Sequence, residues 1–173
     1  WHHTLVRHGS NAGGIRWVPR DLQVYRDRVT GVDRVFLLLG NPGIISGVYD
    51  PREPSRIRWD RHVEFPFLTK GSFFTRPLGI AEANDALHFS EGSSIFRRID
   101  GKRPQWEEIL NLAEDTDTDV GGIRGLTAIQ NPNGKGQSLL FVWAPGERAQ
   151  SQVKRLDPDG KGGYTLHDEA NLG

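Results

Sequence analysis

Apolar and polar residues alternate along this chain in short segments, and the pattern occurs three times. Each copy has an apolar run followed by an alternating segment that ends in an aspartate, at Asp50, Asp100 and Asp157. Ahead of each apolar run stands an Arg with a Leu two positions later. A repeat of roughly 40 to 50 residues, built from short strands and Gly or Pro turns, is typical of a radial array of β-sheets.

Each repeat contains four predicted strands, which alternate or run apolar and are separated by turn sequences. Turns such as Asp100-Gly101 supply positive φ at little cost. Because the connections within a repeat are short, neighbouring strands are predicted to pair antiparallel. Only Gln105–Leu112 offers a helical alternative. The strands are predicted at 22–27, 35–39, 44–49 and 56–65, at 78–83, 86–90, 94–99 and 105–110, and at 126–130, 138–143, 152–156 and 164–168.

The fold class predicted is therefore all-β, with three four-stranded antiparallel sheets of the propeller-blade kind that form half of a six-bladed ring. Residues 1–14, which include His2 and His3, are interpreted as a tag or linker remnant or an N-terminal extension. Residues 15–173 are predicted to form one domain, and its blades are expected at about 20–65, 76–112 and 124–170.

Composition excludes several classes of partner and site but does not identify a function. Lys plus Arg and Asp plus Glu number 22 each, so no net charge favours nucleic acid or an anionic membrane surface as a partner. The apolar runs are too short to span a membrane. Cysteine is absent, which excludes disulfides and Cys-ligated zinc. Twenty-one Gly and ten Pro fit a chain with frequent turns.

Three hairpins carry a resemblance to known propellers. In the clearest, Ile-Asp-Gly is followed by a Trp at position 106, and this segment resembles a degenerate Asp-box, the hairpin of sialidase-like β-propellers. The last is also similar to a hairpin of gluconolactonase-like propellers. The resemblance spans about residues 20–170 and implies blade architecture. Because Asp-boxes lie at the periphery of a propeller, it also implies that the three aspartates form turns rather than catalyse. The hairpins are 49–59, 95–106 and 156–164.

The repeated arginines are the first candidates for ligand binding. Arg20, Arg76 and Arg124 each precede the first apolar residue of a repeat by two positions. In a propeller the first strand of each blade lines the central channel, so the three guanidinium groups are expected to ring the channel mouth. Arginine forks suit a carboxylate or a phosphate. The alternative is that each Arg pairs with a neighbouring blade and only locks the blades together.

Polar residues on the same predicted strands are the second set of candidates. Arg26, Glu82 and Gln130 stand four residues beyond the Leu of each repeat and are expected to line the channel, where they bind a ligand or only water. Glu82 also offers an oxygen for a metal, as in gluconolactonase-like propellers, but no full ligand set is present. No metal and no cofactor are predicted.

No known catalytic motif is present, so the sequence leaves two functions open. The favoured one is a non-catalytic binding or scaffold propeller that recognises a small polar or anionic ligand, a sugar or an acid, at the channel mouth. The alternative is a propeller hydrolase of the lactonase or glycosidase kind. The cellular location and any catalytic residues are not predicted.

Assembly follows from the number of blades. An open three-blade array is expected to expose apolar end faces, and leaving about 800 Å² of such surface in water costs on the order of 20 kcal/mol. A homodimer that closes a six-bladed ring is therefore predicted. The expected end-face residues are Leu37, Leu39, Leu139, Phe141 and Trp143.

Overall fold

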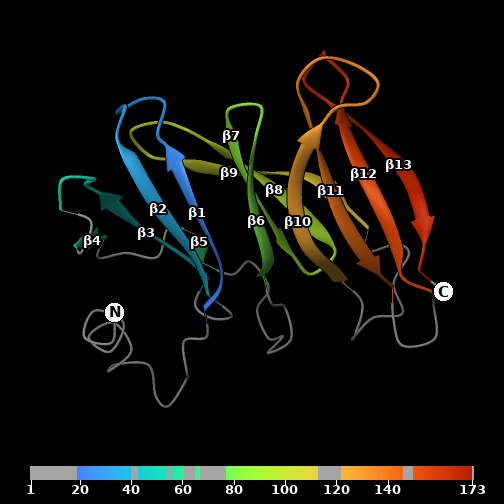
Figure 1. Cartoon of the computed structure of the whole chain (residues 1–173), viewed down its shortest axis with the longest axis horizontal. Helices are drawn as coiled ribbons and strands as arrows, with labels where there is room; N and C mark the ends of the chain where they lie inside the picture. The colour runs from blue at the N-terminus through green and yellow to red at the C-terminus, as the bar shows by residue number, and fades with distance from the viewer. Residues whose placement is uncertain are drawn as a thin grey trace.

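A computed structural model of the chain confirms the all-β class and the three four-stranded antiparallel sheets (Figure 1). The described residues contain thirteen strands and no helix, and so no helix there that could cross a membrane. The Gln105–Leu112 segment, the one helical alternative, forms a strand over Gln105–Asn111. The predicted extension at residues 1–14 lies outside the described part. The structure describes residues 19–39, 43–53, 56–60, 65–66, 77–112, 122–145 and 150–172.

The first sheet has the order β1-β2-β3-β4, and a two-residue strand, β5, also pairs with β3. The single strand predicted at 56–65 is therefore two short strands, and the first strand begins earlier than predicted. The strands of this sheet differ in burial. β2 and β3 are buried on both faces, whereas β1 is exposed at every second residue and so has one face in water. The strands are β1 (Pro19–Arg26), β2 (Asp33–Leu39), β3 (Gly43–Tyr49), β4 (Ile57–Trp59) and β5 (Phe65–Pro66).

The second sheet is a simple meander in chain order. Its first hairpin turns through Asn84 and Asp85, which both have positive φ, at 49° and 64°. Two successive residues in this region make the tight turn that matches the twist of a hairpin. The strands are β6 (Pro77–Ala83), β7 (Ala86–Glu91), β8 (Ser94–Ile99) and β9 (Gln105–Asn111).

The third sheet repeats this meander, with longer turns after its first and third strands. The turn at 131–136 follows the first strand, and the turn at 159–163 follows the third. Both turns lie at the same end of the sheet, because the strands between them run antiparallel. The strands are β10 (Gly122–Gln130), β11 (Gln137–Ala144), β12 (Gln152–Pro158) and β13 (Tyr164–Asn171).

The three sheets stand side by side and meet along their first strands, with β6 in contact with both β1 and β10 (Figure 1). Gly79 in β6 lies so close to β10 that an added Cβ would be 2.5 Å from the Leu126 nitrogen. On the other side, the Ile80 nitrogen donates to Asp21 Oδ2 at 3.0 Å. β6 is thus held against β10 by close backbone contact and against β1 by the Asp21 carboxylate.

Two apolar clusters fill the spaces between the sheets. One joins the first and second sheets and includes Tyr25, Phe36 and Phe89. The other joins the second and third sheets and includes Ala81, Phe141 and Trp143.

The five residues that were expected on exposed end faces are all buried, at 0–3% exposure. That expectation is wrong for these side chains. Two of them, Leu37 and Leu39, form a third apolar cluster with Ile45 and Trp59. The other three belong to the cluster between the second and third sheets. The apolar surface on which the predicted dimer rested is therefore already removed from water within one chain.

Candidate functional site

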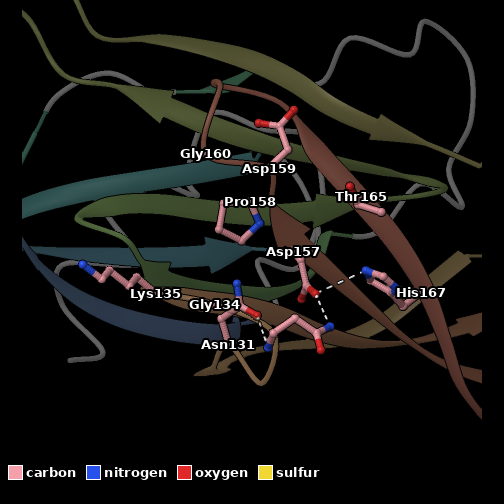
Figure 2. Close-up of a pocket in the computed structure, with 10 residues that line it drawn as sticks. Asn131, Gly134, Lys135, Asp157, Pro158, Asp159, Gly160, Thr165 and His167 are labelled. Atoms are coloured by element: carbon pink, nitrogen blue, oxygen red, sulfur yellow. Dashed lines mark hydrogen bonds and ion pairs between the residues drawn. The ribbon is translucent and has the colours of Figure 1, made fainter.

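The third sheet carries a pocket of about 470 Å³ at its turn end (Figure 2). One wall comes from the turn between β10 and β11, and the other from the turn between β12 and β13 together with the start of β13. Most of the lining side chains are polar. The lining residues are Asn131, Asn133, Gly134, Lys135, Asp157, Pro158, Asp159, Gly160, Thr165 and His167.

The first wall is shaped by hydrogen bonds within its own turn. Asn131 Oδ1 accepts from the Asn133 nitrogen at 2.9 Å, and the Asn131 nitrogen donates to the Gly136 oxygen at 3.0 Å. Gly136 has a φ of 89°, a conformation that favours glycine. The Asn131-Pro132-Asn133-Gly134 sequence therefore builds a turn whose shape does not depend on a ligand.

The second wall is organised by Asp159. Its Oδ1 accepts from the backbone nitrogens of Lys161 at 2.7 Å and Gly163 at 2.9 Å. The Asp159 nitrogen in turn donates to the Gly163 oxygen at 3.0 Å. An aspartate that binds the backbone two and four residues ahead fixes a tight turn. Both walls are consequently held in place by local contacts.

Asp157 lies at the base of the pocket and accepts hydrogen bonds on both oxygens. Ser138 Oγ donates to its Oδ1 at 2.6 Å, and Arg155 Nε donates to the same oxygen at 2.8 Å. Asn133 Nδ2 donates to Oδ2 at 3.2 Å, and His167 Nε2 lies 3.2 Å from that oxygen (Figure 2). The carboxylate therefore ties together β11, β12, β13 and the 131–136 turn.

This surrounding holds Asp157 in its charged form. Burial by itself would raise the pKa of the carboxyl, but hydrogen bonds from Arg155, Ser138 and Asn133 and the charge of Arg155 lower it to about 2. The group is thus ionised at every physiological pH and cannot donate a proton. Because its oxygens already accept from cationic and neutral donors, it is also poorly placed to bind a metal ion. Among the described residues, no group of three or more His, Cys, Asp or Glu could hold one.

The charges that remain at the pocket are of both signs. Lys135 is exposed and makes no ion pair with any described residue, whereas Asp159 is exposed on the opposite wall. Thr165 and His167 stand two residues apart on β13, so their side chains are on the same face of the sheet. The pocket therefore offers hydrogen-bond donors and acceptors without a dominant charge.

The predicted arginines lie elsewhere. Arg20 and Arg124 are exposed near the beginning of β1 and β10, at the opposite end of these strands from the pocket. Arg76 lies outside the described residues. Each first strand contains a β-bulge, at Arg20, Leu78 and Gly125. Arg20 is itself the bulge residue of β1, whereas Arg124 stands one residue before the bulge of β10. These two arginines therefore do not occupy equivalent positions.

The three predicted channel residues are also dispersed. Arg26 is exposed and pairs with Asp33 at 3.5 Å. Glu82 is half-buried in β6, and burial raises the pKa of its carboxyl. Gln130 is at the end of β10, where its Nε2 donates to the Gly136 oxygen at 3.0 Å. Of the five candidates that the structure describes, Gln130 alone adjoins the pocket, as the neighbour of Asn131.

The turn sequences at 131–134 and 157–160 predict both pocket turns, but nothing in the sequence predicts the pocket itself. Asp157 and Asp100 were expected only to form turns, yet both join separate elements. Asp100 Oδ2 accepts from the Tyr25 hydroxyl at 2.6 Å and from the Arg28 nitrogen at 2.9 Å, which links the second sheet to the first. Of the three aspartates, Asp50 alone keeps its side-chain hydrogen bonds with described residues inside its own turn, where it accepts from the Arg52 nitrogen at 2.9 Å. Asp100 and Asp157 share an Arg two positions earlier, and this Arg-x-Asp pattern was the sequence signal that could have distinguished them from Asp50.

Two further buried polar groups lie away from the pocket. His88 is almost fully buried between the second and third sheets, and its Nε2 lies 3.5 Å from the Tyr164 hydroxyl. Burial and the nearby charge of Arg97 lower the pKa of this imidazole to about 4. Glu91, at the end of β7, is buried as well, and burial raises the pKa of its carboxyl to about 7. In both groups, burial by the packed sheets favours the uncharged form.

Comparison of the chain with protein-family models, with curated proteins and with solved structures finds no match.

Proposed function

We propose that this chain is a non-catalytic binding module in which the three sheets are propeller-type blades and the pocket of the third sheet takes a small polar ligand, a sugar or a small acid. The blade arrangement is supported by the meander order of the sheets and by contact along their first strands. The degenerate Asp-box hairpins of the sequence agree with it. The pocket replaces the channel mouth as the proposed site, because Arg20 and Arg124 lie at the other end of the strands.

One observation carries the proposal: a pocket that is lined mostly by residues with polar side chains and whose shape is set by the protein alone. Asn131 and Asp159 each fix one wall through contacts with nearby backbone. A site that is already ordered loses less conformational entropy when it binds a ligand. Opposite charges at Lys135 and Asp159 favour a neutral polyhydroxyl ligand or a monoanion over a multiply charged one.

The alternative, a propeller hydrolase, has one contact in its favour. His167 Nε2 lies 3.2 Å from Asp157 Oδ2, and a carboxylate that orients an imidazole is part of many hydrolytic sites. Among the described residues, no hydroxyl group is hydrogen-bonded to this imidazole, as an activated nucleophile would be. Binding without turnover is therefore the function that the geometry supports best.

The proposal is tested by titrating the protein with a panel of neutral monosaccharides and a panel of small carboxylic acids, followed by NMR. We expect saturable shifts at Thr165 and His167 with at least one ligand. Lys135→Ala should weaken an acid much more than a neutral sugar. Lys102→Ala, an exposed lysine in the turn between β8 and β9, is the matched control and should change neither. A lack of saturable shifts with both panels would refute the proposal, and release of a product from an ester or glycoside would favour the hydrolase.

We extend the proposal to assembly, with a homodimer that completes a six-bladed ring. Its support is the open array of sheets and the exposed Leu166 and Leu172, at 36% and 49% exposure, on and beside β13. Light scattering should then give twice the chain mass of 19.4 kDa. A stable monomer would remove the dimer from the proposal and leave the pocket unaffected.

A further inference from the structure

The turn that forms the first pocket wall contains an Asn-Gly pair, Asn133-Gly134, at an exposed position. An asparagine side chain can be attacked by the backbone nitrogen of the next residue, and this reaction is fastest when that residue has no Cβ. The Gly134 nitrogen donates no hydrogen bond in the described part of the chain, so it is available for the attack. We propose that Asn133 is a site of spontaneous deamidation that alters the pocket.

The reaction needs only water. The deprotonated Gly134 nitrogen attacks Cγ of Asn133, a C–N bond forms, and the side-chain nitrogen leaves as ammonia. Water then opens the cyclic imide at one of its two carbonyls and leaves aspartate or isoaspartate. No atom is oxidised or reduced, and no cofactor takes part.

The contacts of Asn133 explain why the product matters here. Its Nδ2 donates to Asp157 Oδ2 at 3.2 Å. Deamidation replaces this donor with a carboxylate, which faces a second carboxylate that is ionised at physiological pH. Like charges at this distance repel, and Asp157 loses one of the three side chains that donate hydrogen bonds to it, the others being Ser138 and Arg155. The 131–136 turn should therefore move away from β12, and the pocket should lose one wall.

Other asparagines of the chain lack this combination. Asn84 is followed by Asp85 and is held by three hydrogen bonds with Gln137, of 2.6 to 3.1 Å. Asn111 and Asn171 are each followed by leucine, whose side chain hinders attack. These three asparagines are internal controls within the same molecule.

Gly134 supplies a variant that separates chemistry from folding. A Cβ at this position would meet only Asn131 Nδ2, at 3.5 Å, an ordinary van der Waals contact. Gly134→Ala should therefore fold normally and slow the attack. Gly136 would be a poor choice, because its φ is 89° and a Cβ there would lie 2.5 Å from Asn84 Oδ1.

The experiment incubates the full chain in mildly alkaline buffer and follows each asparagine by peptide mass spectrometry. We expect the Asn133 peptide to gain one mass unit faster than the peptides with Asn84, Asn111 and Asn171, and Gly134→Ala to suppress that gain. Asn133→Asp should unfold at a lower temperature than Asn133→Gln, because only the former adds a charge beside Asp157. Equal rates at all four asparagines, or an unchanged rate in Gly134→Ala, would overturn the proposal. These readouts involve no ligand, so they stand or fall separately from the proposed binding function.

Discussion

Replacing Glu91 with glutamine should make the protein more stable at neutral and alkaline pH. Glu91 is 7% exposed at the end of β7, and its Oε1 has no hydrogen-bond partner among the described residues. Glutamine keeps the size of the side chain and removes the charge. The expected gain comes from removing the cost of a buried, unpaired carboxylate.

The sign and size follow from two pKa values. The carboxyl has a pKa of 4.5 in the unfolded chain, and burial raises it to about 7 in the folded protein. Folding therefore favours the protonated form. This contribution to stability is complete below pH 4.5 and is lost as the pH rises through 7. The interval between the two values corresponds to a loss of at most about 3 kcal/mol in the free energy of unfolding.

The assay is urea denaturation of the wild type, Glu91→Gln and Glu53→Gln at pH 5 and pH 8. Glu53 is exposed in the turn after β3 and serves as the matched control. Between the two pH values, the stability of Glu91→Gln relative to the wild type should rise by about 2 to 3 kcal/mol. Glu53→Gln should follow the wild type.

His88 does not disturb this comparison. Burial, with the charge of Arg97, lowers the pKa of its imidazole from 6.5 to about 4, so its contribution to stability is lost as the pH falls through that range. All three proteins contain His88, and the effect cancels in the differences between them. A Glu91→Gln variant whose stability relative to the wild type is the same at pH 5 and pH 8 would refute the reasoning.

Two further predictions concern the contacts between sheets. Gly79→Ala should destabilise the protein by roughly 2 kcal/mol or more, because its Cβ would collide with the β10 backbone at 2.5 Å; Gly101→Ala, with its nearest atom at 3.7 Å, should cost much less in the same urea titration. Asn84→Gly keeps the positive φ of the β6–β7 turn and removes two side-chain hydrogen bonds with Gln137, so it should cost about 1 to 3 kcal/mol. Asp85→Gly, at the adjacent positive-φ position, is its control, because it removes only an exposed ion pair with Arg28, which contributes little to stability; equal losses in the two variants would contradict the role given to Asn84.

The strands could be predicted because the information for them is local. Alternation with a period of two identifies a half-buried strand, and Asn-Gly or Asp-Gly pairs identify the turns. These signals located four strands in each repeat and the two turns that later proved to line the pocket. They erred at strand ends, as at β4 and β5, since an end depends on where a neighbouring strand stops.

The pocket and the buried acids depended on the tertiary structure. Asp50, Asp100 and Asp157 look alike in sequence, yet one contacts its own turn, one a neighbouring sheet, and one three separate elements. A one-residue difference at the bulges also separates Arg20 from Arg124, although both precede Leu by two positions. Sequence spacing counts residues along one strand, whereas burial, pKa and pocket shape depend on which strands and turns the packed sheets place beside each group. The strands therefore followed from the sequence, and the candidate site followed from their packing.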